Sequence, residues 1–133
     1  DFPNDEILGH DGVIAIPHLG ASTPESEDNC AGMAADELTD YIENGNITNS
    51  VNLPNTAMAR SGEKRICIIH KNVPTMITKI TQVLAAKGVN IENMLNTSKK
   101  QYAYTLLDVT GDITDDIANE IAALDDIIRV RVI

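Results

Sequence analysis

The fold is decided by residues 65–91, which read RICIIHKNVPTMITKITQVLAAKGVNI. The apolar run RICIIH predicts a strand, and Pro74 shortly after it predicts the start of a helix. Gly88 predicts the end of that helix. The apolar residues between them recur at helical spacing and predict one buried face, made of Met76, Ile77, Ile80, Val83 and Leu84.

The residues that follow complete a small domain. Residues 89–99 and 102–110 are two runs broken by polar residues, which predict a β-hairpin. Asp112 is expected to cap a second helix, and the run IIRVRV at residues 127–132 predicts a last strand. The second helix carries Asp115 and Asp116 in its first turn and Ile117, Ile121 and Leu124 on its apolar face. The order β-α-β-β-α-β predicts an α/β fold of the α+β kind, a ferredoxin-like antiparallel sheet with both helices on one face.

This arrangement predicts association between copies of the chain. A single layer of helices leaves the other sheet face and the strand edges poorly covered, so we expect a homo-oligomer, at least a dimer, through this domain. Arg129 and Arg131 alternate on the last strand and are expected on a solvated face or edge. Cys67 is expected in the core.

The preceding region of the chain is organised differently. Residues 13–16 predict a buried strand that Pro17 ends, and a loop follows. Thr23 is a good N-cap for a long amphipathic helix that Gly45 ends. Residues 46–64 are rich in Asn, Ser, Gly and Pro and have no helical stripe, which predicts an extended linker. We therefore expect three regions: an N-terminal segment at residues 1–45, a linker at residues 46–64, and a domain at residues 65–133.

Composition excludes several function classes. A net charge of −10 argues against a nucleic-acid surface, and no apolar run approaches the roughly 20 residues that span a bilayer. Cys30 and Cys67 lack the spacing of a zinc site, and the acidic cluster at residues 112–116 lacks that of a calcium loop, so no metal site is expected. Unpaired cysteines and the absence of a leader predict a cytoplasmic protein.

The stretch VIAIPHLGASTPESEDNCAGMAADEL at residues 13–38 resembles the end of the catalytic half of D-isomer-specific 2-hydroxyacid dehydrogenases. The resemblance implies that His18 is the general acid and base, a task that suits an imidazole near neutral pH. It also implies that Gly20 and Ala21 lie near the nicotinamide of NAD. The glycine fingerprint and the catalytic partners of the histidine are absent from this sequence, so the chain by itself is expected to be inactive.

Residues 65–133 resemble the ACT domains that follow the catalytic half in some of these dehydrogenases. In such domains serine binds between two subunits. The resemblance implies that His70, Asn72 and Asn90 contact an amino-acid effector, and amides suit a zwitterion because they both donate and accept. One departure is Thr75, which stands after Pro74 where glycine is usual.

The two resemblances together imply a phosphoglycerate dehydrogenase, an NAD-dependent oxidoreductase acting on a small-molecule substrate. Two alternatives stay open. The first is a dehydrogenase for another 2-hydroxy acid, because His18 is common to the whole family. The second is a binding module, in which residues 65–133 sense an amino acid or only dimerise.

Overall fold

The computed structural model describes residues 3–133, so the first two residues of the expected N-terminal segment lie outside the described residues. The chain separates into two compact units, one ending at Asp36 and the other spanning Glu37–Ile133. Helix α1, Pro24–Asn44, crosses this boundary. Within residues 3–133, no helix is both long enough and apolar enough to cross a membrane.

The start and end of α1 follow the sequence prediction. The backbone N–H of Ser26 donates to Thr23 Oγ1 at 3.3 Å, as expected of an N-cap residue. Gly45 follows the helix with φ +74°, a left-handed conformation that favours glycine. A Cβ on Gly45 would overlap Cys67 Sγ, so this glycine is required for space as well.

The strand expected at residues 13–16 is wrong for this chain, because these residues form no strand. Ile14 is 89% exposed. A strand exists only through its hydrogen bonds to a neighbour. No described strand pairs with residues 13–16, so the apolar pattern has nothing to pack against.

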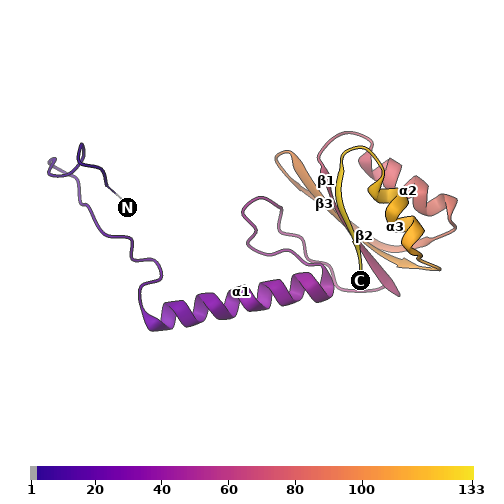
Figure 1. Ribbon diagram of the computed structural model, residues 1–133, viewed down its shortest axis with the longest axis horizontal. Helices are drawn as coiled ribbons and strands as arrows, with labels where there is room; N and C mark the ends of the chain where they lie inside the picture. Colours follow the sequence, from indigo (N-terminus) through magenta and orange to yellow (C-terminus); the bar gives the residue numbers. More distant parts are fainter. Residues whose placement is uncertain (1–2) are drawn as a thin grey trace. The chain divides into compact units, whose positions relative to one another are not determined.

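The second unit contains the predicted β-α-β-β-α-β order (Figure 1). Its elements are β1 Lys64–Lys71, α2 Met76–Ala86, β2 Asn90–Lys99, β3 Tyr102–Thr110, α3 Asp115–Ala122 and β4 Ile127–Val132. The sheet order is β2-β3-β1-β4 with antiparallel neighbours, so the ferredoxin-like prediction is confirmed. The expected cap at Asp112 is wrong: Thr114 is the N-cap, since Ile113 turns inward and is buried before the helix begins.

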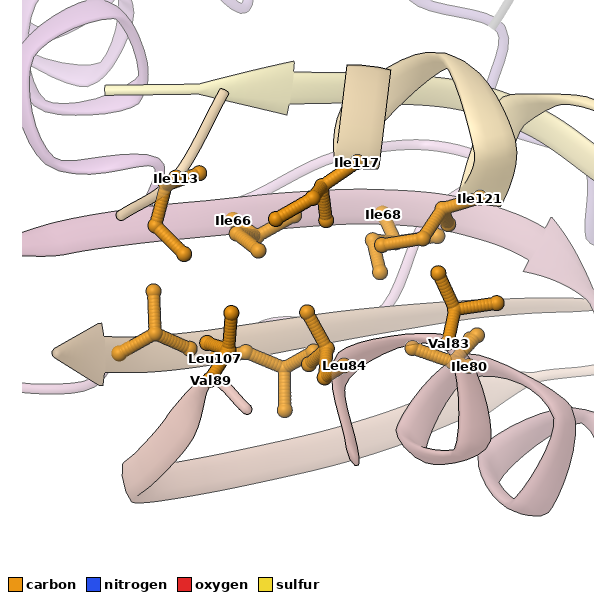
Figure 2. Close-up of a cluster of buried hydrophobic side chains, with 11 residues drawn as sticks. Ile66, Ile68, Ile80, Val83, Leu84, Val89, Leu107, Ile113, Ile117 and Ile121 are labelled. Atoms are coloured by element: carbon orange, nitrogen blue, oxygen red, sulfur yellow. The ribbon is translucent and has the colours of Figure 1, made fainter. Parts of the chain in front are cut away.

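The main core lies between the sheet and helices α2 and α3. Figure 2 shows Ile66 and Ile68 of β1 pointing toward the apolar faces of both helices. Helix α2 buries Met76, Ile80, Val83 and Leu84, while α3 buries Ile117 and Ile121. These are largely the positions that helical spacing predicted.

The opposite sheet face is covered by the chain itself. Residues 45–60 lie against it without forming a helix, and Ile47 and Thr56 join in an isolated bridge. A second apolar cluster forms there from Ile47, Cys67, Tyr104 and Leu106, with Tyr41, Leu53, Met58, Ile69 and Ile133 packed around it. Cys67 is buried as expected, but the expectation that this face is poorly covered is wrong.

Within the second unit, Arg60, Arg65 and Arg131 form a clamp around the C-terminal end of α1. Arg65 Nη1 donates to Asn44 O at 2.8 Å, and Arg60 Nη1 donates to Glu43 O at 3.1 Å. Arg131 Nη2 donates to Tyr41 O, and its guanidinium lies 4.4 Å from the centroid of the Tyr41 ring. The last carbonyls of a helix lack partners within the helix, and guanidinium groups satisfy them here.

This clamp explains the environment of the last strand. Arg129 is exposed as expected, but Arg131 is half-buried in the clamp, so its expected place on a solvated face or edge is wrong. Long-range partners, which alternation along one strand does not reveal, decide its environment.

Candidate functional site

His18, Gly20 and Ala21 lie together on an exposed loop of the first unit. The hydroxyl of Ser22 donates to the His18 carbonyl oxygen at 3.5 Å, a weak contact that folds the loop back on itself. A Cβ on Gly20 would meet nothing within 4 Å. The loop is therefore open to an approaching molecule.

His70 and Asn72 lie where β1 ends and the β1–α2 loop begins. The Asn72 backbone N–H donates to Gln101 O at 2.8 Å, and its amide Nδ2 donates to Lys100 O at 3.2 Å. The loop is thereby tied to the β2–β3 turn. The structure brings these two predicted effector residues together.

The His70 imidazole is buried and hydrogen-bonded through both nitrogens. Nδ1 lies 2.8 Å from Lys71 O, and Nε2 lies 2.9 Å from the hydroxyl of Thr105. Thr105 Oγ1 lies 2.7 Å from Asn96 Oδ1 on β2. The ring is therefore held in one orientation at the end of the sheet.

Thr75 has φ +70° and ψ −1° immediately before α2. This left-handed conformation is costly for a β-branched residue and free of penalty for glycine. Its side chain makes no capping hydrogen bond to α2. The departure from glycine at this position therefore carries a real conformational strain in the candidate effector loop.

Asn90 lies far from His70 and Asn72 within one chain. It begins β2 opposite Thr110, whereas His70 lies opposite Ala103 on β3. Seven residues of extended strand span roughly 20 Å. A single copy of the chain therefore does not bring all three predicted effector residues to one place. The Asn90 amide donates to Glu92 Oε1 at 2.7 Å.

A buried ion pair stabilises the sheet beneath residues 45–60. Arg65 is 0% exposed and Asp108 is 1% exposed, and Arg65 Nε donates to Asp108 Oδ1 at 2.6 Å. Burial alone would raise the pKa of Asp108, but hydrogen bonds from Arg65 and Ser61 outweigh it and hold that pKa below its usual value. The carboxylate therefore stays ionised inside the fold.

The other buried ionisable groups are unsuited to chemistry. Burial raises the pKa of the Cys67 thiol, and burial likewise raises the pKa of Tyr104. The Tyr104 hydroxyl donates to Gly45 O at 2.6 Å, which gives it a structural task. Among residues 3–133, no group of three or more His, Cys, Asp or Glu could hold a metal ion.

Sequence reasoning missed Thr105 and Asn96, which complete the environment of His70. Both lie in predicted strands, where a polar residue usually indicates a position on the surface of the sheet. Only the pairing register, which sets Thr105 opposite Asn96 and next to β1, brings them to the imidazole.

Residues 66–129 match the family model of the AHAS small subunit-like ACT domain. This match agrees with the observed fold, in which two helices cover one face of a sheet with the order β2-β3-β1-β4. Residues 66–129 therefore form an ACT-like domain. The ACT domain from the GTP pyrophosphokinase of Chlorobium tepidum superposes with a TM-score of 0.47 at 18% identity, covering 53% of this chain and 95% of that chain.

The similarity to curated proteins extends beyond the ACT domain. The chain is 32% identical over 110 residues to D-3-phosphoglycerate dehydrogenase of Escherichia coli (strain K12), covering 83% of this chain and 26% of that protein. It is 30% identical over 135 residues to the same-named enzyme of Haemophilus influenzae, covering 98% of this chain and 33% of that protein. The chain thus spans about a quarter to a third of the length of these relatives.

Proposed function

We propose that this chain is the C-terminal region of an NAD-dependent D-3-phosphoglycerate dehydrogenase. The intact enzyme would oxidise 3-phosphoglycerate to 3-phosphohydroxypyruvate in the first step of L-serine biosynthesis, in the cytoplasm. The observation that carries this proposal is the 30% identity to the Haemophilus influenzae enzyme, which runs through both the His18 loop and the ACT domain. We assign residues 1–45 to the catalytic region, 46–64 to the connection and 65–133 to the ACT domain.

His18 is the proposed acid and base of that reaction. An imidazole can take the hydroxyl proton as the hydride leaves the substrate and return it in the reverse direction. The exposed position of His18 on the loop supports this role, because a substrate can reach an exposed imidazole.

The chain has residues suited to the nicotinamide end of NAD but not the glycine motif that binds its pyrophosphate. The open space beside Gly20 suits close approach of a flat ring, and Ala21 next to it is small and exposed. No G-x-G-x-x-G stretch for the pyrophosphate occurs in the sequence. We therefore assign cofactor binding to the rest of the intact enzyme, where NAD would accept the hydride, and expect this chain alone to be inactive.

The ACT domain is the proposed dimerisation surface, through the edge of β2. The opposite sheet face is already covered by residues 45–60, so the unpaired strand edges are what a second copy can complete. β2 is an edge strand of ten residues without proline, and Met94 on it is 44% exposed. The other edge, β4, has six residues, of which Arg131 is engaged with α1.

Antiparallel pairing of two β2 strands would complete the effector site. The start of one β2 would then lie beside the end of the other. Asn90 of the partner subunit would approach His70 and Asn72, which a single chain keeps roughly 20 Å from its own Asn90. This geometry supports one effector site at each end of a twofold interface.

The proposed effector is a small amino acid such as L-serine. Asn72 and Asn90 present amides that can both donate and accept, as a zwitterion requires. The strained Thr75 adds a methyl and a hydroxyl to the loop, so an amino acid other than serine is the alternative effector. Binding would couple to activity by favouring one relative arrangement of the subunits.

The enzyme assignment is tested with the full-length parent protein. NADH formation is measured with 3-phosphoglycerate and with a panel of unphosphorylated D-2-hydroxy acids. We expect 3-phosphoglycerate to have the highest kcat/KM. A higher kcat/KM for another hydroxy acid would show that the enzyme is a dehydrogenase for that acid instead. If the protein turns over none of them, it is a binding or dimerisation module and not this dehydrogenase.

The shared effector site is tested with mixed dimers of this chain. His70→Ala and Asn90→Ala should each abolish binding of L-serine in calorimetric titration. A mixed dimer of the two variants has one site damaged twice and one site intact, so it should bind half as much ligand as wild type. If the mixed dimer binds nothing while wild type binds, the site is not shared.

A further inference from the structure

Three polar side chains form a row across the helix-facing side of the sheet. The row runs from His70 on β1 through Thr105 on β3 to Asn96 on β2. Thr105 is 0% exposed and His70 is 2% exposed, whereas Asn96 lies exposed on the edge strand. The row therefore connects the buried imidazole of the proposed effector site to the β2 edge of the sheet, which is the proposed dimerisation surface.

The three hydrogen bonds around His70 and Thr105 need more protons than a neutral His70 and the threonine hydroxyl supply. Three contacts need a proton each: Nδ1 to Lys71 O, Nε2 to Thr105 Oγ1, and Thr105 Oγ1 to Asn96 Oδ1. A neutral imidazole supplies one proton and the hydroxyl supplies one, because a carbonyl or amide oxygen only accepts. With the amide oxygen facing Thr105, a neutral His70 leaves one contact without a proton.

Two arrangements satisfy every contact and also give the hydroxyl proton an acceptor within the row. In the first, His70 is an imidazolium, Nε2–H donates to Thr105, and the hydroxyl donates to Asn96 Oδ1. In the second, His70 is neutral, the hydroxyl donates to Nε2, and the Asn96 amide has turned so that its N–H donates to Thr105. The outward atom of Asn96 differs between them: an N–H donor in the first and an oxygen acceptor in the second.

We propose that Thr105 and Asn96 are positioning residues of the effector site, which make the protonation of His70 and the orientation of the Asn96 amide change together. This inference rests on the proposed effector site for its biological meaning, but the coupling itself belongs to the chain without effector. A carboxylate or a backbone N–H arriving at the β2 edge would select one orientation and thereby set the proton on His70.

The side chains around His70 other than this row are uncharged or paired with an opposite charge, so the row is the group that we expect to control the protonation of His70. Its strand neighbours Ala103 and Ile127 carry no charge. Helices α2 and α3 present apolar side chains to the sheet: Met76, Ile80, Val83, Leu84, Ile117 and Ile121. The adjacent Lys71 pairs with Asp126 at 3.0 Å, so these opposite charges largely offset each other.

The test uses ¹⁵N NMR of the imidazole in the whole chain at one fixed pH near neutrality. The chain has three histidines, so the His70 signals are assigned by their loss in His70→Gln. Asn96→Asp offers only acceptors and should raise the fraction of His70 protonated on both nitrogens. Asn96→Leu leaves the hydroxyl free for Nε2 and should lower that fraction.

Asn93 provides the matched control, because it is exposed on the same strand but lies opposite Asp108 and not opposite Thr105. Asn93→Asp and Asn93→Leu should give equal fractions. Thr105→Val, which keeps the shape and removes the hydroxyl, should abolish the difference between the Asn96 variants, and Thr105→Ser should restore it. Equal fractions in the two Asn96 variants would overturn the proposal. A difference that survives Thr105→Val would overturn it as well, because the effect would then be through space.

A calorimetric titration with L-serine separates this inference from the proposed function. We expect the two Asn96 variants to differ by about tenfold in affinity, which is the effect of one hydrogen bond of about 1.4 kcal/mol. If the NMR coupling is present and no variant binds serine, the row stands and the serine site fails. If serine binds equally to all of them, the row has no role in effector recognition.

Discussion

Replacing Asp108 by Asn should be among the most destabilising single changes that keep the shape of the side chain. Oδ2 of Asp108 accepts from Arg65 Nη2 at 2.9 Å, from Ser61 N at 2.7 Å and from Ser61 Oγ at 3.1 Å. An amide group in that place would set its own N–H against donors and leave the guanidinium buried without a countercharge. Breaking such a pair costs about 3–5 kcal/mol, a large fraction of the roughly 5–15 kcal/mol that stabilises a domain.

The assay is denaturant unfolding followed by tyrosine fluorescence. All three tyrosines, Tyr41, Tyr102 and Tyr104, lie in the unit Glu37–Ile133, so the signal reports on that unit. The control is Asp126→Asn, which breaks the Lys71–Asp126 pair whose side chains are 58% and 31% exposed. Exposed pairs contribute about 1 kcal/mol or less. If Asp108→Asn costs no more than Asp126→Asn, the reasoning on the buried pair is wrong.

Other predictions concern the backbone, the close packing and the response to acid. Thr75→Gly should raise the free energy of unfolding by about 1 kcal/mol, since it removes the strain of φ +70°; an unchanged or lower melting temperature would contradict this. Gly45→Ala should lower it by about 1–3 kcal/mol, because the new methyl would overlap Cys67 Sγ; the same melting curve as wild type would refute the close contact. The lowered pKa of Asp108 means that its stabilising contribution is complete above the unfolded value of about 3.9 and is lost as pH falls through the folded value. Below about pH 4, the free energy of unfolding should therefore fall more steeply with acid in wild type than in Asp108→Asn, as measured by denaturant unfolding at a series of pH values.

The elements that could be predicted are those encoded by local patterns. Helical spacing in residues 76–84 marks the buried face of α2, and Thr23 with Gly45 marks both ends of α1. The polar break at residues 99–101 marks the β2–β3 turn. Each of these signals is completed within a few residues, so tertiary contacts do not alter it.

The features that could not be predicted depend on partners far apart in sequence. Arg131 contacts the carbonyl of Tyr41, and Arg65 pairs with Asp108, in both cases across many intervening residues. The same reason explains the missing strand at residues 13–16, whose pattern is apolar but whose neighbours are not among the described strands. For the candidate site, the sequence suggested His70 and Asn72 as effector contacts but gave no signal for Thr105, because only the sheet register brings Thr105 to the imidazole.

The proposed function depends on His18 as the proton-transfer histidine of a nicotinamide dehydrogenase. The direct measurement is kcat of the full-length parent enzyme with 3-phosphoglycerate and NAD, for wild type and for His18→Gln. Loss of a general acid and base costs about 10²- to 10⁴-fold, so we expect kcat to fall by that factor while the melting temperature stays unchanged. A His18→Gln enzyme that turns over at the wild-type rate would contradict the assignment of this loop.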